Sequence, residues 1–320
     1  MYADLCWKNI KIGREPTVKV SMDKYIDLFL RSFGDYWHYL KGEIMSPSWH
    51  NYFYWLIAVS LFFWILEIAI PWRKKQKAIR RDFWLDGFYM FFNFFLFSLI
   101  GYNAVSNVFV ELFNDFLALF GITNTVALHV QAFPLWGQLL LMLVIRDFIH
   151  YNVHRLLHRV PILWEFHKVH HSVQEMGFAA HLRYHWMENI VYRFLEYLPL
   201  AMIGFGIQDF FIIHIFTLAV GHFNHSNISI PLGPFKYIFN NPQMHIWHHA
   251  KALPERHRHG VNFGLTLSIW DYLFKTDYIP ETGRDIPLGF DDVESFPEGF
   301  LEQQAYPWFQ KKGEYKGQKE

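Results

Sequence analysis

The chain has 320 residues, of which 52% are hydrophobic, 20% are aromatic and only 18% are charged. This mixture is too apolar for two ordinary soluble domains and indicates one membrane-embedded domain. The 29 Lys and Arg balance the 29 Asp and Glu, so no basic excess points to a nucleic-acid partner. Cys6 is the single cysteine, which excludes a disulfide framework, a cysteine-ligated zinc ribbon and an iron–sulfur cluster held by four thiolates of this chain.

The N-terminal segment, residues 1–48, is predicted to be peripheral. No short apolar run follows a basic start, so we expect no cleavable signal peptide. Between Tyr25 and Lys41, apolar residues recur at roughly helical spacing with charged residues between them. This pattern predicts an amphipathic helix that lies either on a membrane surface or against the protein's own core.

The first membrane span is predicted at residues 52–70, where only Ser60 and Glu67 interrupt an apolar stretch. Its length is close to the ~20 residues that a helix needs to cross the hydrocarbon of a bilayer. Six cations follow between Arg73 and Arg81, and the positive-inside rule places this loop in the cytoplasm. A second span is predicted at 83–101.

The remaining apolar stretches are less regular. Residues 107–128 mix Phe and Leu with acidic residues and fit a partly inserted hairpin. An apolar helix is predicted from 133 to 145, and it continues without Gly or Pro into the first histidines. Pro and Gly interrupt the stretch 190–220, which favours a hairpin of two short helices over one straight span.

Together these elements predict an all-α fold, with a membrane bundle of about four spans and a cytoplasmic helical cap. The predicted divisions are a transmembrane region at 49–145, a histidine-rich domain at 146–280 and a C-terminal extension with a tail at 281–320. The charged end of that tail is expected to be disordered. The protein is thus predicted to be an integral, multi-pass membrane protein, with its histidines on the cytoplasmic face.

Histidine is the residue that composition leaves to be explained, because 16 of the 19 lie between His150 and His259. Three clusters have the spacing of metal ligands: His154 and His158; His167, His170 and His171; His245, His248 and His249. In each H-x-x-H-H cluster the first two histidines are predicted to share a helix face, while the third points about 100° away and can reach a second metal.

The number of clustered histidines indicates two metal ions. A structural zinc ion takes four ligands and a catalytic one about three from the protein, so eight are too many for one zinc. Imidazole binds Fe, Zn, Cu and Ni, and the ligands alone leave the metal open. The chain has no HExxH and no paired ExxH, which argues against a zinc metalloprotease and a soluble carboxylate di-iron bundle.

Five segments between Asp147 and Thr276 carry a family resemblance. They are DFIHYNVHRLLH, WEFHKVHHS, RYHWME, HFNHSN, and MHIWHHA followed by VNFGLTLSIWDYLFKT. In this order they resemble the motifs of the fatty acid hydroxylase/sterol desaturase superfamily of membrane di-iron oxygenases. Two positions depart from the family pattern, since Trp186 stands where proline is usual and Lys275 where glycine is usual.

The resemblance implies a helical cap that holds two non-haem Fe ions, with O2 as co-substrate. It adds His185 and His225 to the eight clustered ligands. Two further histidines, His150 and His222, are possible ligands. The residues predicted to support the ligands are Asp147, Glu188, Asp271 and Asn262, although Asn262 fits a turn better than a ligand.

The leading functional hypothesis is an oxidoreductase that hydroxylates or desaturates a C–H bond of a sterol or fatty-acyl lipid. An alternative is an alkylglycerol (ether lipid) monooxygenase, and a third is a non-enzymatic membrane metal-binding protein. The chain has no GxGxxG, so the electrons are expected from a separate cytochrome b5-like protein, or from a ferredoxin with its reductase. The loop with His257 and His259 is either simply solvated or a docking surface for that donor.

Overall fold

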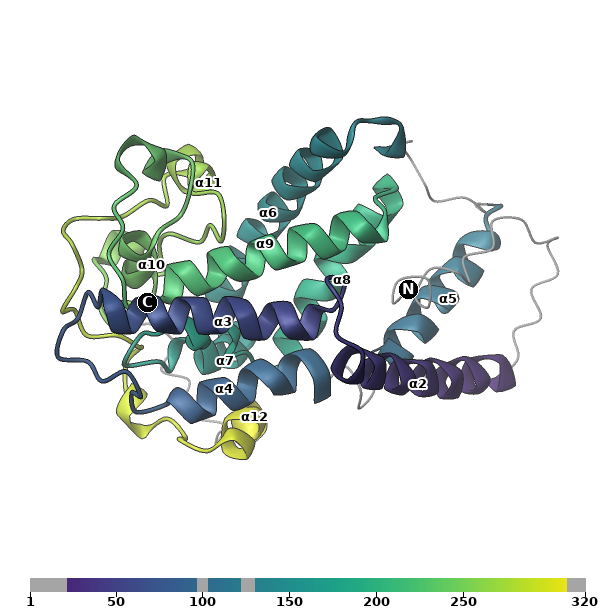
Figure 1. Cartoon of the computed structure of the whole chain (residues 1–320), viewed down its shortest axis with the longest axis horizontal. Helices are drawn as coiled ribbons and strands as arrows, with labels where there is room; N and C mark the ends of the chain where they lie inside the picture. The colour runs from purple at the N-terminus through teal and green to yellow at the C-terminus, as the bar shows by residue number, and fades with distance from the viewer. Residues whose placement is uncertain (1–21, 97–102, 122–129, 310–320) are drawn as a thin grey trace.

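The computed structural model describes residues 22–96, 103–121 and 130–309 of the chain. Figure 1 shows helices joined by loops, and within these ranges no strand is present. Two isolated bridges join Phe239 to Leu267 and Ala250 to Leu288. The predicted all-α fold is confirmed for the part of the chain that the structure describes.

The predicted amphipathic helix is α2 (Met22–Met45), which packs against α5 (Asn103–Ala118) at one end of the molecule (Figure 1). Lys24 Nζ lies 2.5 Å from Asp115 across this contact. One face of α2 is buried, while the opposite face leaves large apolar side chains exposed: Met22, Ile26, Leu30, Phe33 and Trp37. The contact with α5 supports the alternative in which this helix lies against the protein's own core, while contact of its exposed face with a membrane surface stays a prediction. Residues 1–21 lie outside the described ranges.

Helix α3 (Tyr52–Ala69) coincides with the first predicted span. In the described ranges it is the one helix long and apolar enough to cross a membrane. The second predicted span begins as α4 (Phe83–Phe91) and continues as the π-helix η1 (Phe92–Leu96), beyond which residues 97–101 are not described. The stretch predicted as a hairpin corresponds to the single helix α5, and its residues 122–128 are also outside the description.

A proline, Pro161, separates the next two helices, which pack against each other. Helix α6 (Leu135–Arg159) follows Pro134 and runs unbroken through the first histidines, as the sequence predicts. It ends at Arg159, because Val160 precedes a proline and is therefore driven out of the helical region. Pro161 then begins α7 (Pro161–His171) at a position where its missing N–H costs nothing. The histidine-bearing end of α6 thereby lies against α7.

The predicted hairpin at 190–220 consists of α8 (Trp186–Ile203) and α9 (Ile207–His225). The chain turns at Gly204, whose φ of 102° suits glycine, and Pro199 lies inside α8. With 18 and 19 residues, the helices are longer than the short pair expected, because the sequence breaks only at the glycines.

Short elements complete the fold: η3 (Val130–Ala132), η4 (Phe178–Leu182), η5 (Gly233–Tyr237), α10 (Pro242–His248), η6 (Glu255–His257), α11 (Ile269–Phe274), η7 (Val293–Ser295) and α12 (Phe300–Phe309). In Figure 1, α10, α11 and α12 gather at the end of the molecule opposite α2 and α5. Helix α12, from the predicted C-terminal extension, packs against α7. The charged tail, 310–320, is not described.

Candidate metal centre

Nine histidines from four helices converge into two buried groups. The five-histidine group consists of His154 and His158 of α6, His167 and His171 of α7, and His248 of α10. The four-histidine group consists of His170 of α7, His225 of α9, and His245 and His249 beside or within α10. Within each group, one ring nitrogen per histidine lies within 4.8 Å of all the others. Segments far apart in the sequence therefore supply ligands to the same point.

The two H-x-x-H-H clusters are shared between the groups in opposite ways. His167 and His171 face the five-histidine group, while His170 between them faces the other. In the second cluster, His245 and His249 face the four-histidine group, while His248 faces the five-histidine group. The first and last histidines thus pair, rather than the first two as the sequence suggested, because residues four apart differ by about 40° around a helix and residues three apart by about 60°.

The Nε2 atoms of each group face one another. In the five-histidine group, Nε2 of His154 lies 3.2 Å from Nε2 of His167, and Nε2 of His171 lies 3.1 Å from that of His248. In the four-histidine group, Nε2 of His225 lies 2.9 Å from that of His245 and 3.4 Å from that of His170. Such distances bring several lone pairs to a common point.

In five of the nine histidines the opposite ring nitrogen is held by an acceptor, whereas Nδ1 of His245 and of His249 is buried without a partner among the described residues. The Nδ1 atoms of His154, His225 and His248 each donate to a carbonyl oxygen at 2.8 Å, that of His170 to Arg183 O at 3.3 Å, and that of His167 to the Glu188 carboxylate at 2.7 Å. A proton on Nδ1 leaves Nε2 of a neutral imidazole with only its lone pair. Fixing that tautomer through the outer nitrogen is how proteins orient histidine ligands.

This arrangement fits a cation in each group. Without one, His154 and His167 would press two lone pairs together, and so would His170 and His225. Protonation is disfavoured, because burial and then the charge of neighbouring imidazoles hold the pKa of His167 and His171 well below the usual range. Nε2 of His158 is buried and has no hydrogen-bond partner among the described residues. Neutral imidazole nitrogens are the form that binds a metal.

Glu188 is the predicted supporting carboxylate that touches a histidine of the groups. Asp147 instead accepts hydrogen bonds from the backbone N–H of Thr266 and Leu267. Asp271 binds two further backbone N–H groups, those of Phe263 and Gly264. Both aspartates therefore act indirectly, by shaping the loop whose carbonyl at Phe263 holds His154.

Asn262 occupies a turn, as the sequence favoured, with a φ of 52°. Its side chain donates to the carbonyl oxygens of Met244 and Tyr278. These contacts tie the turn to α10. They occupy the Asn262 amide nitrogen with backbone carbonyls rather than with a histidine.

Three predicted or possible ligands lie outside the groups. His185 Nε2 donates to the Gln304 carbonyl at 2.7 Å, against α12. His150 Nδ1 lies 2.6 Å from the Glu196 carboxylate. His222 lies 3.1 Å from both Ser60 Oγ and His181 Nδ1. The hydrogen-bond partners of these three histidines are distant in the sequence, so the spacing of the histidines does not predict them.

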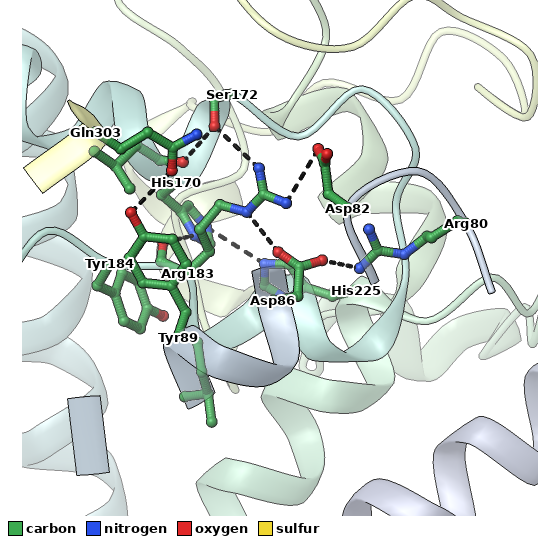
Figure 2. Close-up of polar contacts among 12 residues, drawn as sticks. Arg80, Asp82, Asp86, Tyr89, His170, Ser172, Arg183, Tyr184, His225 and Gln303 are labelled. Carbon is green, nitrogen blue, oxygen red and sulfur yellow. Dashed lines mark hydrogen bonds and ion pairs between the residues drawn. The ribbon is translucent and has the colours of Figure 1, made fainter. Parts of the chain in front are cut away.

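A buried ion network beside the four-histidine group was not anticipated from the sequence (Figure 2). The Arg183 guanidinium contacts Asp86 and Asp82, and Asp86 also pairs with Arg80. Arg183 donates to Ser172 Oγ at 3.2 Å as well. The available signal was Asp86 itself, since a carboxylate in an apolar helix requires a partner.

This network connects both histidine groups. The backbone carbonyl of Arg183 accepts from His170, while its side chain holds Ser172, the residue after His171. Figure 2 shows His170 and His225 beside the guanidinium and Asp86. One arginine therefore fixes the end of α7, from which ligands of both groups project.

The protein-family model for fatty acid hydroxylase matches residues 139–276. These residues form a fatty acid hydroxylase domain. The match covers the five segments quoted above, and all nine grouped histidines lie within it. The resemblance inferred from the sequence is confirmed.

Several characterised proteins are similar to the chain. An ornithine lipid hydroxylase of Rhizobium tropici is 35% identical over 180 residues, or 56% of this chain and 53% of that protein. Human alkylglycerol monooxygenase is 32% identical over 131 residues, or 41% and 28% of the two chains. A methylsterol monooxygenase of Aspergillus fumigatus is 26% identical over 204 residues, or 58% and 62%. The alignments therefore span about half of the first relative and less than a third of the second, and no solved structure matches.

Proposed function

We propose that the protein is a membrane-bound, non-haem di-iron oxidoreductase that uses O2 and external electrons to hydroxylate or desaturate a C–H bond of a lipid. The observation that carries this proposal is the pair of adjacent histidine groups, whose inner Nε2 atoms face one another while acceptors hold the outer Nδ1 atoms of five of the nine histidines. Bound iron would supply the one-electron steps by which O2 is reduced and the lipid oxidised.

The chain's own residues would prepare this chemistry in three ways. The anchored Nδ1 atoms orient the ligands, as Glu188 does for His167. Burial keeps bulk water from the centre, since His167, His170 and His249 are almost fully inaccessible. The Arg183–Asp86 ion pair beside the four-histidine group has no net charge. It therefore holds these segments together without adding a positive charge that would repel a bound cation.

We propose a multi-pass arrangement with the histidine groups at the cytoplasmic face. The cationic loop Arg73–Arg81 follows α3 directly, and the histidines lie at the same end of the molecule, since Asp86 near the start of α4 touches Arg183. In this arrangement 1–48 is peripheral, 49–145 is the transmembrane region, 146–280 carries the histidines and 281–320 is an extension.

A specific observation favours ether-lipid cleavage as the second candidate. Alkylglycerol monooxygenases of four animals are 26–33% identical to this chain over 41–47% of its length. Hydroxylation of the carbon beside an ether oxygen would begin with the same C–H oxidation. Either reaction consumes O2 with two electrons and two protons, and it forms one water molecule with each hydroxylated lipid; a cytochrome b5-like or ferredoxin donor would supply the electrons.

The test combines metal analysis with lipid analysis. The full chain is purified in detergent, its iron content is measured, and lipids of cells with and without the gene are compared. We expect bound iron and at least one lipid whose hydroxylated, desaturated or ether-cleaved product depends on the gene. The variants His170→Ala and His248→Ala should lose iron and product, whereas the exposed His50→Ala should retain both. Full activity in either group variant, or activity without a transition metal, would contradict the proposal.

A further inference from the structure

An exposed apolar surface on η5 and α11 has no role in the metal centre. It is formed by Phe235, Tyr237, Phe239, Ile269, Leu273 and Phe274, which are between 38% and 63% exposed. The two segments are held together by backbone contacts: Ser268 N donates to Ile238 O, and Asn240 N donates to Thr266 O, each at 2.9 Å. Contiguous exposed apolar surface on a rigid support marks an interaction site.

Charge around this surface favours a negatively charged occupant. Lys236 lies within η5, Lys275 directly follows α11, and the Arg155 guanidinium lies 5.8 Å from the Phe274 ring. Asp271, the acidic residue of α11, is fully buried. The next carboxylate along the chain is that of Asp277, which is half-buried and lies two residues after Lys275. Aromatic side chains beside lysine and arginine are characteristic of membrane interfaces.

The surface is continuous with the exposed side of α6. Trp270 of α11 packs on Phe148 of α6, with 5.0 Å between ring centroids. Farther toward the start of α6, Leu140 and Trp136 are 55% and 71% exposed. Arg155 lies seven residues after Phe148, or about 10 Å along the helix. The outer side of α6 therefore changes from apolar to cationic at the level where η5 and α11 lie.

We propose that the η5–α11 surface is inserted into the headgroup region of an anionic lipid bilayer. The segment from Phe263 to the end of α11 then has two faces with different partners. Its outer residues meet lipid, while its inner backbone is held by Asp147 and Asp271 and presents the Phe263 carbonyl to His154. Docking on lipid would set the depth of the five-histidine group relative to the bilayer. A second copy of the chain is the competing occupant.

Fluorescence quenching in vesicles tests the depth of this surface. In a Cys6→Ser background, Leu273→Cys receives an environment-sensitive fluorophore, and Glu255→Cys on the exposed η6 turn is the matched control. The full chain is reconstituted in phosphatidylcholine vesicles with and without phosphatidylglycerol. We expect a lipid-borne nitroxide to quench the label at 273 several-fold more than the label at 255, and aqueous iodide to show the reverse order.

The charge contribution is tested in the same preparation. Phosphatidylglycerol should increase lipid quenching at 273, and the double variant Lys236→Gln/Lys275→Gln should lose that increase. Equal quenching at 273 and 255 would overturn the proposal, as would shielding of 273 from both quenchers that disappears on dilution, because a second copy would then cover the surface. An unchanged response to phosphatidylglycerol in the double variant would overturn the anionic assignment. None of these readouts depends on bound iron or on turnover.

Discussion

The guanidinium of Arg183 and the carboxylate of Asp86 lie 2.5 Å apart, and both side chains are buried. The two residues join η4 and α8 to the beginning of α4, across nearly a hundred positions of sequence. Because the Arg183 carbonyl holds His170, this ion pair couples a helix of the predicted membrane region to the four-histidine group.

We expect Asp86→Asn to weaken both the fold and the metal site. The substitution leaves Arg183 and Arg80 buried without their shared counter-charge, and breaking such a pair costs about 3–5 kcal/mol. Thermal unfolding and the visible spectrum of bound Co²⁺ measure the two effects. Asp82→Asn is the matched control, since the Asp82 side chain also pairs with Arg183 but is 24% exposed. Its loss should therefore have a smaller effect. Equal effects of the two substitutions would refute the special role of Asp86.

Glu188 offers a graded test of ligand orientation. Its carboxylate accepts from Nδ1 of His167 at 2.7 Å. Loss of such an outer partner typically lowers metal affinity by about 10–100-fold. We expect Glu188→Ala to show this loss and Glu188→Gln, which retains an acceptor oxygen, to show a smaller one. Competition between the protein and a chelator of known Co²⁺ affinity measures it, and an unchanged affinity in Glu188→Ala would contradict the assignment.

Gly221 allows the His181 ring to lie against α9. A Cβ atom at this glycine would be 2.1 Å from the His181 ring, so Gly221→Ala forces buried groups apart, at a typical cost of about 1–3 kcal/mol. Gly42→Ala is the control, since nothing lies within 4 Å of its Cβ position in α2. It should leave stability unchanged or raise it by up to about 1 kcal/mol through helix propensity. Thermal unfolding of both variants distinguishes local crowding from a general intolerance of alanine.

The metal-free protein should lose stability as the pH falls. Burial lowers the pKa of His248 from 6.5 to about 4, and burial also lowers the pKa of His167 and His171. The unfolded state therefore binds protons more readily, so this stabilisation is full above pH 6.5 and is lost between 6.5 and about 4. Asp271, Asp147 and Glu188 act oppositely, because burial raises the pKa of all three, that of Asp271 to about 6. The nine grouped histidines, whose pKa burial lowers, outnumber these carboxyls. Thermal unfolding from pH 7.5 to 4 measures the trend, and an increase in the melting temperature toward pH 4 would contradict it.

Features that depend on neighbours along the chain follow from the amino-acid order alone. The apolar run of 52–70 predicts α3, Pro161 separates α6 from α7, and the glycines after Ile203 open the hairpin of α8 and α9. The number of clustered histidines also indicated two metal ions, and their spacing indicated that one cluster can face both, because the angle between residues on one helix follows from its pitch.

Which histidines meet depends on the packing of distant helices. The angle around α7 separates His170 from His171, but only the positions of α9 and α10 give each a set of partners. His185 satisfies the family spacing, yet α12 offers it the Gln304 carbonyl from 119 positions away. Asp86 and Arg183 likewise find each other across 97 positions. Spacing fixes the direction of a side chain on its own helix, whereas its partner depends on the packing of distant segments, which burial of apolar surface and of paired charges determines.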